Sequence, residues 1–447
     1  MKLITEKWFC LIFLVVIGFN STYAQNQVIT LTWEDVVSRS LSDNLSIKSL
    51  NMDYNSQNLS KWQALTSFLP SVSYGGVLTK NIELPVMTMM GQTFTIGTKY
   101  SYGHSFQLVY PIFTGLARLS NYKLQNSLQK SLKQELEGQK DEVVLNALQA
   151  YFGVMLANSL IEVNTEAVAA AKSNLEEVKH FYEVGAASQL DLKRAEANYY
   201  STLPGLESSK NNKKTTLNQL KFILNISLED SLVILDKLDE KDFLGDNSDL
   251  SIENLKSISL DNRSEIKMIE HQSNVVAQQK NLVLAEFAPT VSFVADLSFN
   301  AMRDKYEVTW NDYIRSKSIY LNIQWSLFEG GNRALALQKA NIEIDKMGIL
   351  EKQTHDQVLI DVEQNYFNLQ VSSNNLVSLK STFDQATESM RLANLMYKEG
   401  MSTQVEVLDA QTFYTQTRAS LEQGIYQYNI DQLSLLKSIG KIKSIWE

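Results

Sequence analysis

Two carboxylates near the C-terminal end of the chain, Glu406 and Asp409, have a spacing that could serve a chemical role. Residues three positions apart on a helix lie on the same face, so the pair would form a small negative patch that attracts cations. A helix face that simply contacts water can have the same pattern. The pair alone therefore does not distinguish a functional site from a solvated acidic surface.

The remaining candidates for chemistry do not form a recognisable site. The four histidines lack the spacing of metal ligands; they are His104, His180, His271 and His355. Gly330 and Gly331 lack the downstream lysine and hydroxyl residue of a phosphate-binding loop, and they fit a turn before a helix capped by Asn332. We expect no catalytic residues, no metal site and no cofactor, and an enzyme could be accommodated only in residues 226–249.

Composition favours long, uninterrupted elements. The chain has 447 residues, of which 44% are hydrophobic, enough for a folded core. It has only 5 prolines and 18 glycines, fewer loop-forming residues than many small domains would need. The formal charge is −9, and this acidity argues against nucleic acid as a partner.

The first 24 residues have the pattern of a secretion signal. Lys2 and Lys7 flank the start, residues 8–19 are apolar, and Ala24 is a plausible cleavage point. Such a run is too short to span a bilayer as a helix. Cys10, the single cysteine, lies inside the signal, so we expect an exported mature chain without disulfides or thiolate metal sites.

The chain contains an internal duplication. At an offset of 215 residues, "IFTGLAR" (112–118) matches "LFEGGNR" (327–333), and "FYEVGAASQLDLKRAEA" (181–197) matches "MYKEGMSTQVEVLDAQT" (396–412). Further upstream the offset is 219, where "FLPSVSY" (68–74) matches "FAPTVSF" (287–293). The difference must fall in residues 80–99 and 301–317, which we predict to be surface loops. The predicted organisation is a first repeat at 25–225, a spacer at 226–249, a second repeat at 250–440 and a tail at 441–447.

Each repeat combines a very long helix with short strands. Residues 119–182 and 334–397 have apolar positions three and four apart and no proline, which predicts two helices of about 100 Å. Apolar and small or polar residues alternate in 71–74, 100–112, 291–299 and 319–327. A half-buried strand of a soluble sandwich alternates in this way, but the secretion signal and the many aromatic residues favour strands of a membrane barrel. Because the smallest such barrels have about eight strands, several copies would have to share one.

This order of parts resembles the TolC family of outer-membrane efflux ducts. The resemblance rests on the signal, the two strand pairs, the two long helices, the corners at Phe113 and Gly115 and at Phe328, Gly330 and Gly331, and the segment containing "VEVLDAQ" (405–411). It implies a mainly helical homotrimer, in which a twelve-stranded outer-membrane β-barrel continues into a twelve-helix periplasmic α-barrel with a small mixed equatorial domain. Each corner would be the place where a strand leaves the membrane and becomes a tunnel helix. The segment "MTMM" at 87–90 could indicate export of a soft metal, but an apolar extracellular loop that folds over the pore mouth accounts for it better.

The resemblance also implies a function. We expect a passive exit duct of a tripartite efflux pump or type I secretion system, located in the outer membrane of a Gram-negative bacterium and reaching into the periplasm. Its partners would be outer-membrane lipid, a periplasmic adaptor protein and an inner-membrane transporter. The main alternative is a coiled-coil surface or adhesive structural protein, which is not expected to contain duplicated strand pairs. A second alternative is the adaptor itself, which is not expected to carry four amphipathic strands.

The tip of the helices is the expected gate. Gly185 and Gly400 would close the two long helices in left-handed conformation. By the resemblance, three copies each of Glu406 and Asp409 would ring the periplasmic entrance and raise one another's proton affinity. Asp191 and Tyr397 would form one link that holds the entrance closed. Ser402 stands where the family's best-known member has an arginine, which puts a second link in doubt.

Pro204 is expected to interrupt the returning helix of the first repeat. Beyond it, "NQL" (218–220) matches "DQL" (431–433) at an offset of 213, which implies two extra residues in the first repeat. Proline removes an amide donor and clashes with the preceding helical turn. We therefore predict a bulge or kink there, and an unbroken helix at 418–421.

Overall fold

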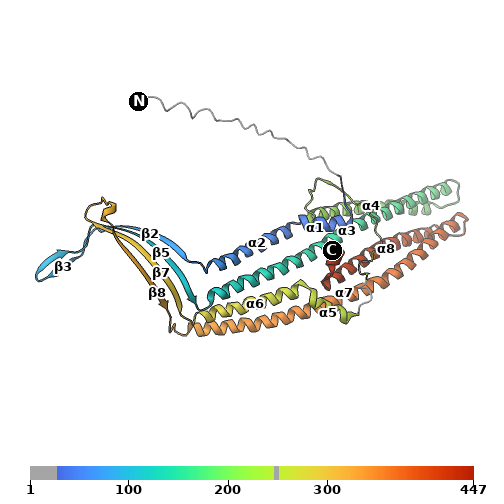
Figure 1. Cartoon of the computed structure of the whole chain (residues 1–447). Helices are drawn as coiled ribbons and strands as arrows, with labels where there is room; N and C mark the ends of the chain where they lie inside the picture. The colour runs from blue at the N-terminus through green and yellow to red at the C-terminus, as the bar shows by residue number, and fades with distance from the viewer. Residues whose placement is uncertain (1–27, 246–250, 447) are drawn as a thin grey trace, which may run out of the picture.

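The structure of the chain is a computed structural model that describes residues 28–245 and 251–446. The predicted signal, residues 1–24, lies outside the described residues. Figure 1 shows an elongated molecule in which a β-sheet stands at one end and helices run from it to the other end. The arrangement is mainly helical, as the sequence predicts.

Two helices of 67 residues dominate the molecule. They are α3 (Ala117–Glu183) and α7 (Asn332–Lys398), and their length of about 100 Å confirms the expectation from periodicity. Each is followed by a returning helix of 35 residues, α4 (Gln189–Ile223) or α8 (Gln404–Ser438). Each repeat begins with a shorter pair: α1 (Trp33–Asp43) and α2 (Leu45–Thr66), then α5 (Ile252–Asn262) and α6 (Ser264–Ala285). The bounds of these pairs differ by 219, and those of the long helices by 215, so the duplication is visible in the fold.

The prediction of an interruption at Pro204 is wrong. Helix α4 runs through Pro204 without a break, and α4 and α8 end at the same offset of 215 that they have at their starts. No residues are inserted, so the match of "NQL" with "DQL" is a coincidence of short motifs. The hydroxyls of Ser201 and Thr202 donate to the carbonyls of Asn198 and Tyr199, at 2.8 and 2.7 Å. Proline removes only one amide from the helix, and α4 continues for many residues on both sides of it.

Four long strands form one antiparallel sheet. Its order is β2–β5–β7–β8, with β2 at Ser71–Lys80, β5 at Tyr100–Thr114, β7 at Thr290–Arg303 and β8 at Ile314–Gln324. Strands β2 and β8 lie at the two edges and are exposed along their whole length. The prediction that 80–99 and 301–317 are only loops is wrong in part. The first contains a hairpin of β3 (Val86–Met89) and β4 (Gln92–Thr95), and the second includes the ends of β7 and β8.

The helices continue the sheet as a curved layer. Next to the sheet, α3 packs against α2 and α6, and α6 packs against α7. Toward the far end, α3 packs against α4 and α8, and α8 packs against α7. Helix α3 is therefore central throughout, whereas α7 lies at one edge and α2 and α4 at the other (Figure 1).

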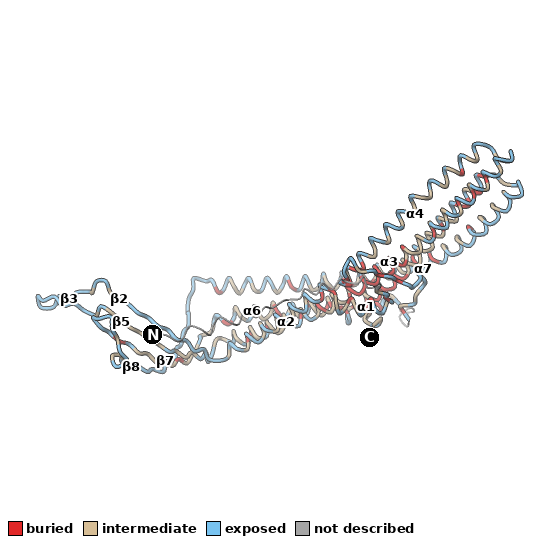
Figure 2. The backbone as a smooth tube through the Cα atoms, turned by 90° about the horizontal axis from the view of Figure 1, so that it is seen from above, coloured by how far each residue is buried: buried red, intermediate tan, exposed pale blue. Residues whose placement is uncertain are grey.

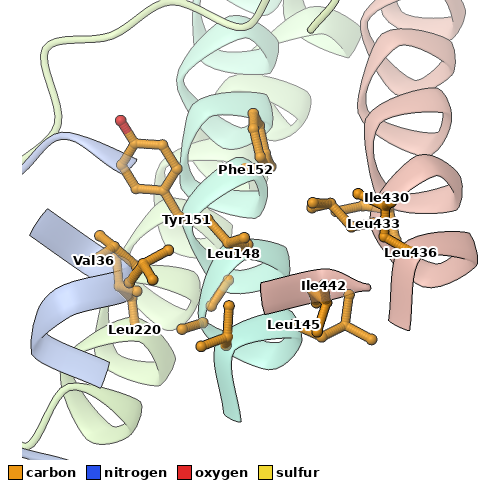
Figure 3. Close-up of a cluster of buried hydrophobic side chains, with 14 of the residues drawn as sticks. Val36, Leu145, Leu148, Tyr151, Phe152, Leu220, Ile430, Leu433, Leu436 and Ile442 are labelled. Atoms are coloured by element: carbon orange, nitrogen blue, oxygen red, sulfur yellow. The ribbon is translucent and has the colours of Figure 1, made fainter. Parts of the chain in front are cut away.

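The main hydrophobic core lies near the middle of the long helices. Figure 2 shows buried residues concentrated there. Figure 3 shows Leu148 and Phe152 of α3 on the side toward Leu433 and Leu436 of α8, whereas the Tyr151 ring points to the opposite side of α3. Helix α3 is the one helix of the described residues that is long and apolar enough to cross a membrane by length and composition. Its residues from 144 to 155 contribute heavily to this core, so packing accounts for its hydrophobicity.

A small group of elements from both ends of the chain and from the segment between the repeats packs at the level of the main core. Strand β1 (Val28–Thr30) pairs in parallel with β6 (Ser231–Val233). Beyond β6, the backbone is held against α8 by two buried amides: Asn429 bonds the carbonyl of Asp239 and the amide of Lys241, and Gln432 bonds the carbonyl of Lys241 and the amide of Phe243. The short helix η3 (Ile442–Ile445) completes the group. This small mixed unit packs against the middle of α3.

Candidate functional site

The two helical tips have the turn geometry predicted for Gly185 and Gly400. Their φ angles are +79° and +70°, the left-handed region that glycine adopts readily. In the first tip the amide of Ala186 donates to the carbonyl of Phe181 at 2.7 Å, and in the second the amide of Met401 donates to that of Met396 at 2.8 Å. These bonds close the last helical turn and send the chain back. Both glycines face open space, so their backbone conformation, and not crowding, is what favours glycine there.

Glu406 forms a capping box at the start of α8. The amide of Thr403 and the hydroxyl of Ser402 donate to its carboxylate at 2.9 and 2.5 Å, and its own amide donates to Thr403. The hydrogen bond from Ser402, followed by that from the Thr403 backbone, lowers the pKa of Glu406. Within one chain the pKa of Glu406 is thus lowered. A ring of crowded carboxylates from three chains was expected to raise it. Ser402, the residue that put a second link in doubt, therefore makes a local bond to Glu406.

Asp409 shares the exposed face of α8 with Glu406, as their spacing predicts. The residues that follow each of them, Val407 and Ala410, lie on the buried face of α8. Among the described residues, no ion pair involves Asp409. Its carboxylate is thus available to an ion or to another chain.

Asp191 is the equivalent of Glu406 in the first repeat. It forms a capping box with Ser188, whose hydroxyl donates to it at 2.6 Å, and Arg194 lies 3.8 Å away. Tyr397 packs edge-on against Phe181, with ring centroids 5.8 Å apart. Burial, and then the negative charges of Asp191 and Glu177, raise the pKa of Tyr397. Among the described residues, the chain has no hydrogen bond between Tyr397 and Asp191, although the two are near enough to interact electrostatically.

Sequence reasoning missed the capping roles and three links between helices. The capping boxes were readable as "SQLD" at 188–191 and "TQVE" at 403–406. Gln404 donates to Asn174 at 2.6 Å, Asn198 donates to Gln411 at 3.4 Å, and Arg418 forms an ion pair with Glu166. These contacts fasten α8 to the first repeat, and no local sequence pattern indicates them.

The two strand-to-helix corners are built alike. Gly115 and Gly330 have φ angles of +60° and +64°, and the next residues, Leu116 and Gly331, are also left-handed. A side chain on Gly115 would collide with the carbonyl oxygen of Ala285, so only glycine fits there. Phe113 and Phe328 are exposed, as expected for side chains that face an apolar environment.

An arginine fixes each corner. The guanidinium of Arg118 lies 5.0 Å from the ring centre of Phe68, and that of Arg333 lies 5.7 Å from that of Phe287. Arg118 also donates to the carbonyl of Ser67 at 3.3 Å, and Arg333 to that of Ser326. The repeated arginine therefore packs on an aromatic ring just beyond the end of the preceding helix, α2 or α6, and connects that segment to the corner.

No group of acidic, histidine or cysteine side chains suited to a metal ion occurs among residues 28–245 and 251–446. The fold and its two ends are those of an elongated channel-type protein: an open sheet with exposed edges, long helices and a polar tip. Comparison with known proteins places this arrangement in a family.

The chain matches the family described as "Outer membrane efflux protein" over residues 36–225 and 255–441. The chain belongs to this family, which confirms the sequence-based recognition. It is 21% identical over 316 residues to the outer membrane protein TolC of Salmonella enteritidis, a match that covers 69% of this chain and 63% of TolC. It is 20% identical over 328 residues to the alkaline protease secretion protein AprF of Pseudomonas aeruginosa, covering 73% of this chain and 67% of AprF.

The fold is similar to that of solved outer membrane channels. With the Campylobacter jejuni CmeC outer membrane channel the TM-score is 0.79 at 16% sequence identity, covering 92% of this chain and 86% of CmeC. The predicted location is confirmed as well: the chain is an outer-membrane protein of a Gram-negative bacterium that extends into the periplasm. Coiled-coil adhesion, the alternative function, receives no support from these relatives.

Proposed function

We propose that three copies of this chain form the outer-membrane exit duct of a tripartite efflux pump or type I secretion system. The observation that carries the proposal is the open sheet. Strands β2 and β8 are edge strands with unpaired backbone groups, which cannot remain unpaired in a bilayer. Four strands cannot close a barrel, whereas three copies would supply twelve.

The outer helices support the same assembly. Leu45, Met52 and Leu59 of α2 are seven residues apart and at least 60% exposed, and so are Leu335, Ile342 and Ile349 of α7. A seven-residue apolar repeat is the seam of two packed helices. Because α2 and α7 lie at opposite edges of the layer, the stripe on α7 of one copy can meet the stripe on α2 of the next. Twelve helical stretches would then close an α-barrel below the β-barrel, with the unit near β1, β6 and η3 around its equator.

The tip is the proposed gate. Three copies of Glu406 and Asp409 would surround the entrance and favour cations, and Asp191 with Tyr397 would help to hold it closed. TolC is named as an outer membrane protein and AprF as a secretion protein. By analogy with such relatives, an inner-membrane transporter would supply the energy, and a periplasmic adaptor would dock at the tip. The protein itself would be a passive channel and not an enzyme.

Purification and bilayer recording test the proposal. The protein extracted from outer membranes in mild detergent should have three times the mass of the mature chain and should conduct ions in planar bilayers. A monomer in the outer membrane, or a trimer that never conducts even with the tip carboxylates and Tyr397 replaced, would contradict it.

A further inference from the structure

The charges on the apolar face of the sheet are distributed unevenly. Strand pairing assigns Tyr74, Phe106, Leu297 and Lys317 to one row across the four strands, and Gly76, His104, Phe299 and Arg315 to the next row toward the free end. On this face the four strands carry four charged residues, all of them cations: Lys80, Arg303, Arg315 and Lys317. The one carboxylate within the four strands, Asp296, points to the opposite, polar face.

Arg315 and Lys317 are the two of these cations that lie nearest the apolar band. Both are exposed, and neither has an ion-pair partner among the described residues. Arg303, by contrast, is paired with Asp312. Two unpaired cations on a lipid-facing surface are unfavourable at the bilayer centre but are tolerated near its boundary.

Aromatic side chains show that these cations lie at that boundary. The ring nitrogens of His104 form hydrogen bonds with the hydroxyls of Tyr74 and Tyr313 at 2.8 and 3.1 Å. His104 therefore connects the row that contains Arg315 to Tyr74 in the next row and to Tyr313 just before β8. Trp310 packs on Tyr313 with ring centroids 5.4 Å apart and is 79% exposed. A second aromatic group, with Trp325, lies at the corner end. Such belts mark the two membrane interfaces of a barrel.

The distance along β8 agrees with this position. Ten residues separate Arg315 from Trp325, or about 33 Å of extended strand. At the usual tilt of about 40°, this corresponds to a height of about 25 Å, the thickness of the apolar band of a barrel. Because the helices leave the sheet at the Trp325 end (Figure 1), Arg315 and Lys317 lie at the outer leaflet.

We propose that Arg315 and Lys317 form a binding site for the phosphate groups of lipopolysaccharide in the outer leaflet. This inference rests on the proposed trimeric barrel and adds a specific lipid to it. Guanidinium and ammonium groups both bind phosphate well, the former through two parallel hydrogen bonds. The acyl chains would lie against the apolar residues below, such as Ile319 and Leu321, which are 75% and 60% exposed. Three such sites would surround the barrel, one on each β8.

The test measures binding of diphosphoryl lipid A to the purified trimer. Relative to the wild type, Arg315→Gln/Lys317→Gln should bind it about thirtyfold more weakly, since two cations are removed and each cation near a charged surface contributes about 1 kcal/mol. Arg315→Lys/Lys317→Arg, which preserves both charges, should bind within about twofold of the wild type. Lys305→Gln is the matched control, since Lys305 is an exposed cation in the loop before β8.

Further measurements separate this inference from the proposed function. Dephosphorylated lipid A should bind the wild type and the double glutamine variant equally, and inorganic phosphate at millimolar concentration should not compete with lipid A. Trimer mass and conductance in neutral phosphatidylcholine bilayers should be the same for all variants. A conducting trimer in which the glutamine variant binds diphosphoryl lipid A as tightly as the wild type would overturn the lipid site alone. Absence of a conducting trimer in the wild type would instead overturn the proposed function.

Discussion

Helices α3 and α7 are equivalent in the repeat but differ in their surroundings. Both have 67 residues, yet α3 packs against α1, α2, α4, α6 and α8, whereas α7 packs against α5, α6 and α8. The exposed stripe on α7, Leu335, Ile342 and Ile349, corresponds at the 215 offset to Ser120, Ser127 and Gln134 on α3. Position in the layer, and not ancestry, therefore decides which face of each helix is apolar. An apolar stripe on the edge helix is consistent with a neighbouring chain covering it.

The largest expected difference concerns the aromatic pair that both helices retain. Phe152 of α3 is 1% exposed, and its equivalent on α7, Phe367, is 48% exposed. Phe152→Ala should lower the free energy of unfolding by about 4 kcal/mol because it leaves a cavity in the main core. Phe367→Ala should cost about 1 kcal/mol, since less apolar surface leaves water there. Denaturant unfolding of the detergent-solubilised protein would measure both, and equal losses would show that Phe367 is buried as deeply as Phe152 in the assembled protein.

A buried carboxylate gives the next largest effect. Asp141 of α3 is 8% exposed, and its Oδ1 has no hydrogen-bond partner in the described structure. Burial raises its pKa from 3.8 to about 6, with Glu137 and Glu265 adding to the rise and Lys443 and Lys437 opposing it. The folded chain thus favours the protonated form, so ionisation costs stability as the pH rises from about 4 to above 6. A shift of this size corresponds to about 3 kcal/mol.

Asp141→Asn should therefore stabilise the protein at pH 7.5 by up to about 3 kcal/mol, and should have little effect at about pH 4. The exposed equivalent on α7, Asp356, provides the control: Asp356→Asn should change stability little at either pH. Unfolding curves at the two pH values would measure the difference. A stabilisation by Asp141→Asn that is the same at both would rule out its ionisation as the cause.

The third effect concerns the edge of the layer. Ile342→Glu would place a charge in the apolar stripe of α7, which we expect to be covered by α2 of the next copy. The fraction of trimer at a fixed protein concentration should fall at least tenfold, because burying an unpaired charge costs several kcal/mol. Asn341→Glu, at the adjacent exposed position, is the control and should assemble normally. Size-exclusion chromatography with light scattering would decide, and normal assembly of Ile342→Glu would place the interface elsewhere.

The same comparison shows what the sequence could predict. Apolar positions three and four apart were sufficient to predict α3 and α7, because helix periodicity is a local property of the sequence. The recurrence of Gly115 at Gly330 indicated the two strand-to-helix corners. The central place of α3 was not predictable, because its neighbours lie far away in the chain. The effect of Pro204 on α4 was overestimated, because the packing of α4 outweighs the loss of one backbone hydrogen bond. The ends of β7 and β8 were missed because Arg303, Arg315 and Lys317 interrupt the apolar face of the alternation there. At the tip, Gly185 and Gly400 were located correctly, whereas the local bonds of Glu406 were overlooked.

The smallest expected effect concerns the two acidic residues of the second tip. Glu406 serves the capping box as well as the proposed ring, whereas Asp409 makes no capping bond, and its first-repeat equivalent is the cation Arg194. Asp409→Asn should therefore reduce cation selectivity and block by multivalent cations while the fold of the tip is unchanged. Glu406→Ala/Asp409→Ala should remove both properties, but it would also cost roughly 1 kcal/mol of helix stability at the α8 start. Selectivity from reversal potentials in planar bilayers, recorded beside thermal unfolding, separates charge from capping. If Asp409→Asn and the double variant retain wild-type selectivity, the constriction lies at another level of the duct.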